Sequence, residues 1–185
     1  MGRHGNWQRS LKRNLTEVEK RTDLTDDQKV ALVTRLCSAA CAAVAIQPIP
    51  FADFFVLTPM QMYAGSRIAA IRGVRIGERG VHTVVKEIMG AIGLGLVGQQ
   101  LVVGAYKTIV PVLGALTTIP LVYGATTAIC AVMDAYFKAA ARGVSVSPED
   151  MRRTWEREKA RGEEEGRQRE QDIRDQADRG PSDAP

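Results

Sequence analysis

A literal G-x-G-x-x-G pattern lies in the stretch GAIGLGLVGQQLVVG, at Gly93, Gly95 and Gly98. In dinucleotide-binding folds such glycines follow a strand, let the backbone approach a pyrophosphate, and precede an acidic residue by about 20 positions. Here the preceding residues, HTVVKEIM, have a helical pattern, and no Asp or Glu occurs between Glu87 and Asp134. The chain also lacks the G-x-x-x-x-G-K-[ST] phosphate loop. We therefore predict no nucleotide site and no cofactor.

The same glycines fit a helix-packing surface instead. At about 100° per residue, a narrow face of one helix carries five mostly small residues: Ala91, Gly95, Gly98, Val102 and Ala105. Such faces let two backbones approach closely, and in lipid they drive helix association. A glycine costs about 1 kcal/mol in the interior of a helix in water, so this stretch favours a packed or membrane setting.

Residue types that carry catalysis or bind metals are sparse. Cys37 and Cys41 lie one helical turn apart, but the chain has only two histidines, both distant in sequence, so we interpret the cysteines as small core residues. The four acids between Leu36 and Ser147 form no carboxylate pair and no triad. Three polar residues are candidates for function: Asp53, Gln99 and Gln100. Asp53 could cap a helix or form an ion pair, and the two glutamines could make interhelical contacts or line a polar path. We predict that the protein is not an enzyme and holds no metal.

Charge is distributed unevenly along the chain. Residues 1–35 have a net charge of +3, residues 36–147 have +4 with only twelve charged side chains, and residues 148–185 have −3. The pI near 9.1 is basic, but aromatic residues are few and bases alternate with acids at both ends, so we predict no nucleic-acid binding. We expect three parts: a basic mobile arm (1–22), a helical domain (23–143), and a charged solvated helix with a disordered tail (144–185).

Helix caps and breakers predict an all-α fold. Thr25 and Gln28 have the spacing of a capping box, and a helix should run from them to the prolines of QPIP. A second helix should contain a kink at Pro59 and stop at Gly73. The residues SPED, at 147–150, start the charged C-terminal helix. Between these we expect a third helix and a fourth, with boundaries near Glu78 or Val81, at Pro111 and Gly114, and at Gly143.

Two long uncharged runs predict a membrane hairpin. Ile88–Tyr106 and Thr108–Met133 contain no charged residue, and about 20 apolar residues cross a hydrocarbon core. Basic residues flank the pair, so the positive-inside rule places both termini in the cytoplasm. Five basic residues are candidates for contact with headgroups or a partner: Arg67, Arg72, Arg75, Arg79 and Lys86. A soluble bundle rich in Ala and Gly is the alternative, and Leu36–Ala70 could form a re-entrant or interfacial pair.

Residues 30–137 carry a family resemblance. The segment AAVAIQPIPFADFFVLTPMQMYAGSRIAAIRGV and the later YKTIVPVLGALTTIPLVYGATTAICAVMDAYF resemble the YcjF-like domain of unknown function, which occurs alone or at the C-terminus of some bacterial Era-like GTPases. The most specific part is P-I-P-x-A-D at residues 48–53, followed by Pro59 and Gln61. The resemblance implies membrane association in a bacterium. This chain has no GTPase motifs, so the resemblance does not extend to GTP hydrolysis.

Together these features predict a non-catalytic membrane module. We expect it to bind membrane lipid at the bacterial inner membrane, to form a homo-oligomer through the glycine face, and to anchor or assemble a partner. The resemblance implies a GTPase in trans as that partner. We identify no small-molecule substrate. Two alternatives stay open: an oligomeric pore or transporter-like channel around Asp53, Gln99 and Gln100, and a soluble cytoplasmic adaptor whose charged C-terminal helix binds a partner.

Overall fold

A computed structural model describes residues 3–46, 56–76, 78–92 and 111–179. Within these ranges all regular secondary structure is helical, which confirms the predicted all-α fold. The described helices are α1 (Arg3–Lys20), α2 (Asp26–Ala45), α3 (Thr58–Ile71), α4 (Glu78–Ile92), α6 (Pro111–Ala141), α7 (Pro148–Gln168) and α8 (Glu170–Arg179).

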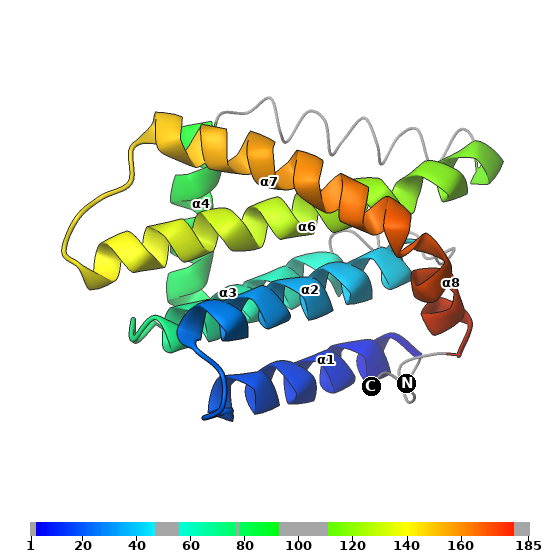
Figure 1. Cartoon of the computed structure of the whole chain (residues 1–185), viewed down its shortest axis with the longest axis horizontal. Coiled ribbons are helices and arrows are strands. Elements are labelled where there is room, and N and C mark those ends of the chain that lie inside the picture. The colour runs from blue at the N-terminus through cyan, green and yellow to red at the C-terminus, as the bar shows by residue number, and fades with distance from the viewer. Residues whose placement is uncertain (1–2, 47–55, 77, 93–110, 180–185) are drawn as a thin grey trace.

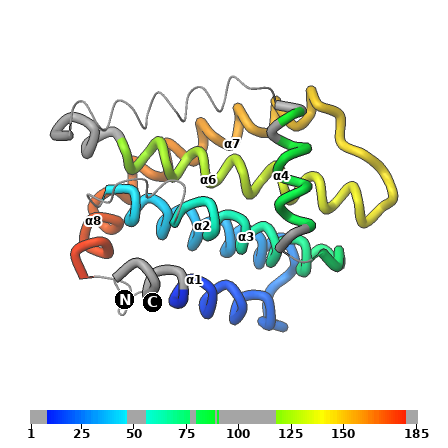
Figure 2. Tube along the Cα trace, turned by 180° about the vertical axis from the view of Figure 1, so that it is seen from behind, coloured from blue at the N-terminus to red at the C-terminus, as the bar shows by residue number. Residues whose placement is uncertain are grey.

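Helix α6 lies at the centre of the arrangement. In Figure 1, α7 lies along one side of α6, α2 and α3 lie along the other, and α1 lies beyond them. Seen from behind in Figure 2, α4 crosses the direction of the long helices at a steep angle. The short α8 turns away from the end of α7 and packs against α2. The described helices thus form a layered bundle in which α1 and α7 are the outer layers.

The predicted starts of α2 and α7 are confirmed. The Thr25 hydroxyl accepts a hydrogen bond from the Gln28 backbone N–H at 3.3 Å, and the Gln28 side-chain oxygen accepts one from the Thr25 N–H at 2.9 Å. This is the complete capping box. Ser147 likewise accepts from the Asp150 N–H at 3.1 Å, with Pro148 at the first helical position. The two starts were therefore encoded locally.

The predicted stops of α3 and α6 are also confirmed. Gly73 and Gly143 have φ values of +76° and +70°, which side chains rarely adopt, and each follows the last turn of its helix. Pro59 lies in the first turn of α3, directly after the π-helical residues Val56 and Leu57. The kink expected there stays a prediction, because residues 47–55 lie outside the described residues. Helix α4 begins at the predicted Glu78, and its predicted continuation beyond Ile92 lies outside the described residues.

Residues 3–20 form helix α1, so the expectation of a mobile arm is wrong. Leu11, Leu15 and Val18 lie on one face and are at most 5% exposed, where α1 packs against α2 and α3. The Thr16 and Tyr63 hydroxyls are hydrogen-bonded at 2.8 Å, which adds a polar link to α3. The apolar stripe consists of only three residues among many polar ones. It could be recognised as a packing face only when α2 and α3 were seen to lie against it.

The expectation that the C-terminal helix is solvated is also wrong for residues 148–179. Helix α7 packs along α6, and α8 buries Ile173 and Ala177 near α2. Although α7 is strongly charged, it buries Met151 and Trp155 and two glycines, Gly162 and Gly166. These glycines remove side chains from the face toward α6, so shape as well as apolar area holds the helix there.

Two described helices are long and apolar enough to cross a membrane: Asp26–Ala45 in α2 and Thr118–Ala141 in α6. The second overlaps the predicted span at Thr108–Met133, whereas most of the first predicted span, Ile88–Tyr106, lies outside the described residues. In the bundle these helices are interior, with 56% of the α2 window and 67% of the α6 window buried. Core helices of soluble proteins can be equally long and apolar, so these two properties alone are weak evidence that a helix crosses a membrane.

Candidate functional site

The charged ends of α2, α3 and α6 meet at one end of the bundle. Asp27 near the start of α2, Arg72 after the last turn of α3, and Asp134 and Lys138 near the end of α6 form one ion network. Beyond it, Leu36–Ala45, Thr58–Ser66 and Thr118–Met133 contain no charged residue. In Figure 1 this network end is on the left, where α2 begins and α6 ends. The three central helices therefore have a charged end and an uncharged remainder in common.

Arg72 is the centre of the ion network. Its Nε donates to Asp134 at 2.6 Å, and its Nη2 donates to the second Asp134 oxygen at 3.1 Å and to Asp27 at 2.6 Å. Lys138 Nζ lies 3.0 Å from oxygens of both aspartates. Burial alone would lower the pKa of Arg72, but the hydrogen bonds to Asp134 and Asp27 outweigh it and raise that pKa above its usual value. The ion pairs of this network tie α2, α3 and α6 together.

A groove of about 420 Å³ runs from this network between α2, α6 and α7. Its lining combines small and polar residues with both signs of charge, so it offers no strongly acidic or basic cavity. The charged and hydroxyl groups along it are Asp27, Thr34, Arg35, Arg72, Tyr123, Thr127, Asp134, Lys138, Thr154, Arg157, Glu158, Arg161 and Glu165. The groove can accept polar contacts from a partner, but its charges already pair with one another.

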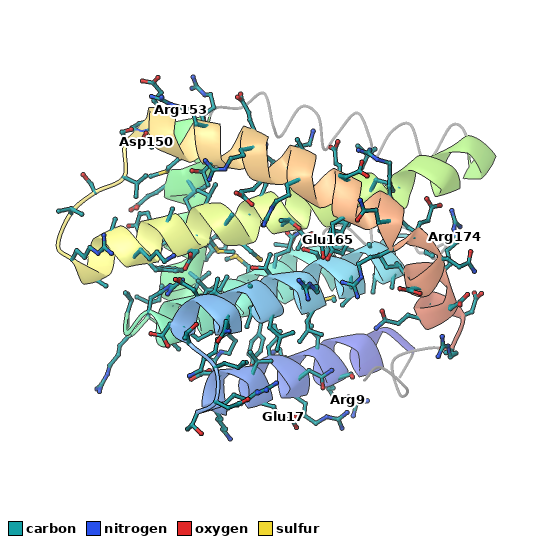
Figure 3. The ribbon with its side chains drawn as sticks, viewed as in Figure 1. Arg9, Glu17, Asp150, Arg153, Glu165 and Arg174 are labelled. Carbon is teal, nitrogen blue, oxygen red and sulfur yellow. The ribbon has the colours of Figure 1, made fainter. Side chains whose placement is uncertain are left out.

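A second polar cluster lies along the groove, farther along α6. The Tyr123 hydroxyl donates to Glu165 at 2.7 Å and accepts from Arg169 at 3.3 Å. Arg35 of α2 contacts the same carboxylate, with 3.3 Å between Nε and Oε1. Figure 3 shows Glu165 on α7 facing the inner helices. This cluster fixes α7 onto α6 and α2, and it contains no activated nucleophile.

Close backbone approach fixes α7 along the same line. A Cβ placed on Gly162 would lie 2.8 Å from Thr127 side-chain atoms and 2.9 Å from the Cα of Gly124. A Cβ on Gly166 would lie 2.9 Å from Tyr123 Cβ and 3.0 Å from Pro120 Cα. Real Cβ atoms essentially never approach this closely. The G-x-x-x-G spacing of residues 162 and 166 was the sequence signal for this contact, and our sequence analysis missed it.

Buried hydroxyls and an amide link the uncharged parts of the central helices. Ser38 and Thr127 are hydrogen-bonded at 3.0 Å, which joins α2 to α6. Gln61, one of the residues that carry the family resemblance, donates its side-chain N–H to Thr126 at 3.0 Å and joins α3 to α6. Cross-helix bonds of this kind are typical of polar residues inside membrane bundles and also of soluble cores. They hold the helices in register without any charge.

Two of the arginines predicted to contact headgroups have partners within the bundle instead. Arg67 donates to Glu19 of α1 at 2.8 Å and lies over the Tyr63 ring, 5.0 Å from its centroid. Arg72 is only 9% exposed and is held by Asp134. Each of these arginines therefore has an acidic partner distant in sequence, and its contact with a headgroup stays a prediction. Arg75 and Lys86 are exposed, as expected for surface contacts.

Most of the predicted packing and polar residues lie outside the described residues. These are Asp53, Gly95, Gly98, Gln99, Gln100, Val102 and Ala105. Ala91 and Arg79 are within α4, but their side chains are among those not described. The predicted glycine face, the polar path and the roles of Asp53 as a helix cap or ion-pair partner therefore stay predictions.

Cys37, Cys41 and Cys130 are buried free thiols. The sulfurs of Cys37 and Cys41 lie 4.0 Å apart, and the Cys37 thiol also contacts the Met60 carbonyl at 3.8 Å. Among the described residues, no group of three or more His, Cys, Asp or Glu side chains is arranged to hold a metal ion. The cysteines pack as small core residues.

Comparison of the chain with known proteins found no relative. The chain matches no protein-family model, and it has no significant match among curated proteins or solved structures. The resemblance to the YcjF-like domain therefore stays a prediction from the residues quoted above.

Proposed function

We propose that the protein is a non-catalytic helical module that associates with a membrane and anchors or assembles a partner there. The observation that carries the proposal is the shared polarity of α2, α3 and α6. Their charged residues lie in the half toward the ion network, with Arg35 the farthest along α2, and the other half is uncharged. Two of these helices have the length and hydropathy of a membrane span. A bundle whose apolar lengths lie side by side can enter a bilayer without carrying charges into it.

In the described arrangement the apolar helices face protein. Helix α7 covers α6, and Glu163 and Lys159 pack against Gly124 in the middle of the apolar window. Val144 is the only exposed large hydrophobic residue in the described parts of the chain. We therefore propose that this closed bundle binds at the membrane surface. Entry of α6 into the bilayer requires α7 to separate from α6, because α7 cannot carry its charges into hydrocarbon.

The end of the bundle that carries the ion network suggests the orientation of the protein in the membrane. Since Asp27 at the start of α2 lies 3.0 Å from Lys138 near the end of α6, both ends belong to the same side of the bundle. We propose that this side faces the cytoplasm of a bacterium, and that α1, α7 and both termini stay on that side of the membrane when α2 and α6 enter the bilayer. Reporter fusions at the N-terminus and after Arg142 should both give a cytoplasmic signal. A periplasmic signal from either would contradict this orientation.

Carbonate extraction of membranes from cells that express the full chain tests the association itself. We expect the protein in the membrane fraction before extraction, and a resistant portion after it if α2 and α6 have entered the bilayer. A cytoplasmic adaptor is the second candidate, because α7 covers α6 and the described surface is polar. Recovery of the protein only in the soluble fraction would contradict the membrane module and favour the adaptor.

The finer parts of the proposal concern partners. We propose self-association through the small-residue face around Gly95 and Gly98, and cooperation with a GTPase in trans, as the family resemblance implies. Crosslinking in native membranes followed by size analysis and partner identification tests both. A monomer without crosslinked partners would contradict these two points and leave membrane association standing.

A further inference from the structure

We propose that the outer face of α1 is the surface with which the protein docks on an anionic lipid bilayer. The inference rests on the proposed membrane association and names the surface that makes the first contact. Its central residues are Arg9, Arg13 and Lys20, all exposed on the side of α1 away from the bundle. Figure 3 shows Arg9 extending outward from α1.

The geometry of α1 separates the basic residues from the buried ones. At about 100° per residue, Arg9, Arg13 and Lys20 fall within roughly 40° of one another around the helix. Leu11, Leu15 and Val18 are centred about 180° away, and these three are buried against α2 and α3. The stripe is about 16 Å long at 1.5 Å per residue. Because its apolar face is anchored in the bundle, α1 presents this stripe in a fixed orientation.

The charge of the α1 surface is one-sided. Among the α1 residues whose side chains are described, the exposed charged residues are four bases and one acid, Glu17. The other acids of this region have partners elsewhere: Glu19 binds Arg67 toward α3, and Asp23, beyond the helix, binds Arg21. Lys12, one of the four bases, lies over the Tyr63 ring at 5.0 Å and so leans toward the bundle. The outward field of α1 is therefore positive.

Helix α7, on the opposite side of the bundle, provides the contrast. Its exposed charged residues are five bases and four acids. Many of them pair along the helix, as Arg153 does with Glu149 at 2.7 Å and Arg161 with Glu158 at 2.6 Å. A near-neutral mixed surface of this kind is weakly attracted to an anionic membrane, whereas a surface with a net positive charge, such as the described outer face of α1, is attracted to it. The structure therefore favours α1 over α7 as the docking side.

The described contacts also favour lipid over nucleic acid. Helix α1 packs directly on α2 and α3, two of the three helices with uncharged lengths. Docking through α1 would thus bring the apolar part of the bundle to the bilayer surface. Its basic stripe is short and has an acid, Glu17, beside Arg13, one helical turn away. A groove that follows a nucleic-acid backbone would need a longer basic track and stacking side chains.

Vesicle co-sedimentation of the full chain tests the inference. The probes are vesicles of phosphatidylcholine alone and vesicles with 30% phosphatidylglycerol added to it, as roughly matched neutral and anionic surfaces. We expect binding to the anionic vesicles that weakens with salt, and a loss of about 100-fold in affinity for the triple variant Arg9→Gln, Arg13→Gln, Lys20→Gln. The control, Arg153→Gln, Arg157→Gln, Arg161→Gln, removes the same number of charges from α7 and should change binding by less than about five-fold.

A variant that binds more tightly shows that changes in binding come from the docking surface and not from unfolding of the protein. Glu17 is exposed beside the stripe and points outward in Figure 3, so Glu17→Lys should strengthen binding to anionic vesicles about ten-fold. The docking face would be overturned if the wild type and both triple variants bound equally, or if the two triple variants lost the same affinity. Membrane association in cells would still stand. Failure to bind any vesicle, together with recovery only in the soluble fraction, would overturn both proposals. Tighter binding of a DNA duplex than of anionic vesicles, lost in the α1 variant, would assign the stripe to nucleic acid instead.

Discussion

Helices α6 and α7 are chemically opposite, yet they share the most extensive helix–helix contact among the described elements. From Thr118 to Met133, α6 contains no charged residue, whereas α7 has charged residues in every turn and a buried surface of few apolar side chains. Hydrophobicity alone would separate these two helices, one into a core or bilayer and the other into water. They stay together because glycines on both sides let the backbones approach and because Tyr123 binds Glu165.

Helix α7 shows that a strongly charged helix can be an integral layer of a helical bundle. The charges of α7 occupy its outer face and its edges, while positions 151, 155, 162 and 166 form the inner face. Successive positions are four or seven residues apart, which is the spacing of a single helix stripe. Two members of the stripe are glycines, which hydropathy does not score as contact residues. The inner face of α7 is therefore invisible to an analysis that looks only for apolar side chains.

Removing α7 and α8 should have the largest effect. A chain that ends after Ser147 would uncover Tyr123, Gly124 and Thr127 on α6, and we expect it to leave the soluble fraction for membranes or aggregates. Fractionation and circular dichroism measure this. A chain that ends after Arg179 is the control and should behave as the full protein. Unchanged solubility and unfolding of the shorter chain would show that α7 is a dispensable layer.

Filling the glycine contact should have the next largest effect. Gly162→Leu places a side chain where even a Cβ would be 2.8 Å from Thr127, and overpacking of this kind costs about 1–3 kcal/mol of unfolding free energy. Gly90→Leu is the matched control, since a Cβ there meets nothing within 4 Å. Chemical denaturation measures both. Equal destabilisation by the two substitutions would contradict close approach between α6 and α7.

Breaking the ion network on α6 should cost somewhat less. Asp134→Asn removes the bidentate partner of Arg72, whose side chain is 9% exposed, and we expect a loss of about 2 kcal/mol in unfolding free energy. Asp27→Asn is the control, because Asp27 is 74% exposed and its ion pairs should contribute at most about 1 kcal/mol. A larger loss from Asp27→Asn than from Asp134→Asn would contradict the assignment of Asp134 as the main partner.

The ion pairs on the outer face of α7 should have the smallest effect. Arg153 and Glu149 lie 2.7 Å apart but are 66% and 73% exposed, and such helix pairs contribute about 0.3–0.5 kcal/mol. Arg153→Gln should therefore change the midpoint of urea unfolding only slightly, and less so in high salt. A loss comparable to that of Asp134→Asn would mean that the outer charges of α7 stabilise the layer, contrary to the comparison of its two faces.

The sequence by itself determined most of the helices and several of their ends, with α1 as the exception. Thr25 with Gln28, Ser147 with Pro148, and Gly73 and Gly143 act within one turn of chain, so their effects can be predicted without a fold. The uncharged length of α6 was predicted for the same reason, because hydropathy is a property of consecutive residues. Local chemistry therefore determined these helix ends and which helices are apolar.

Only the tertiary structure decided which surfaces meet. Arg67 and Arg72 looked like solvent-facing bases, but Glu19 and Asp134, 48 and 62 residues away, pair with them. Helices α1 and α7 looked like solvated appendages, since three apolar residues in one and two glycines in the other acquire partners only when α2, α3 and α6 lie beside them. The physical reason is that burial and ion pairing depend on residues distant in sequence, and no local pattern specifies those partners.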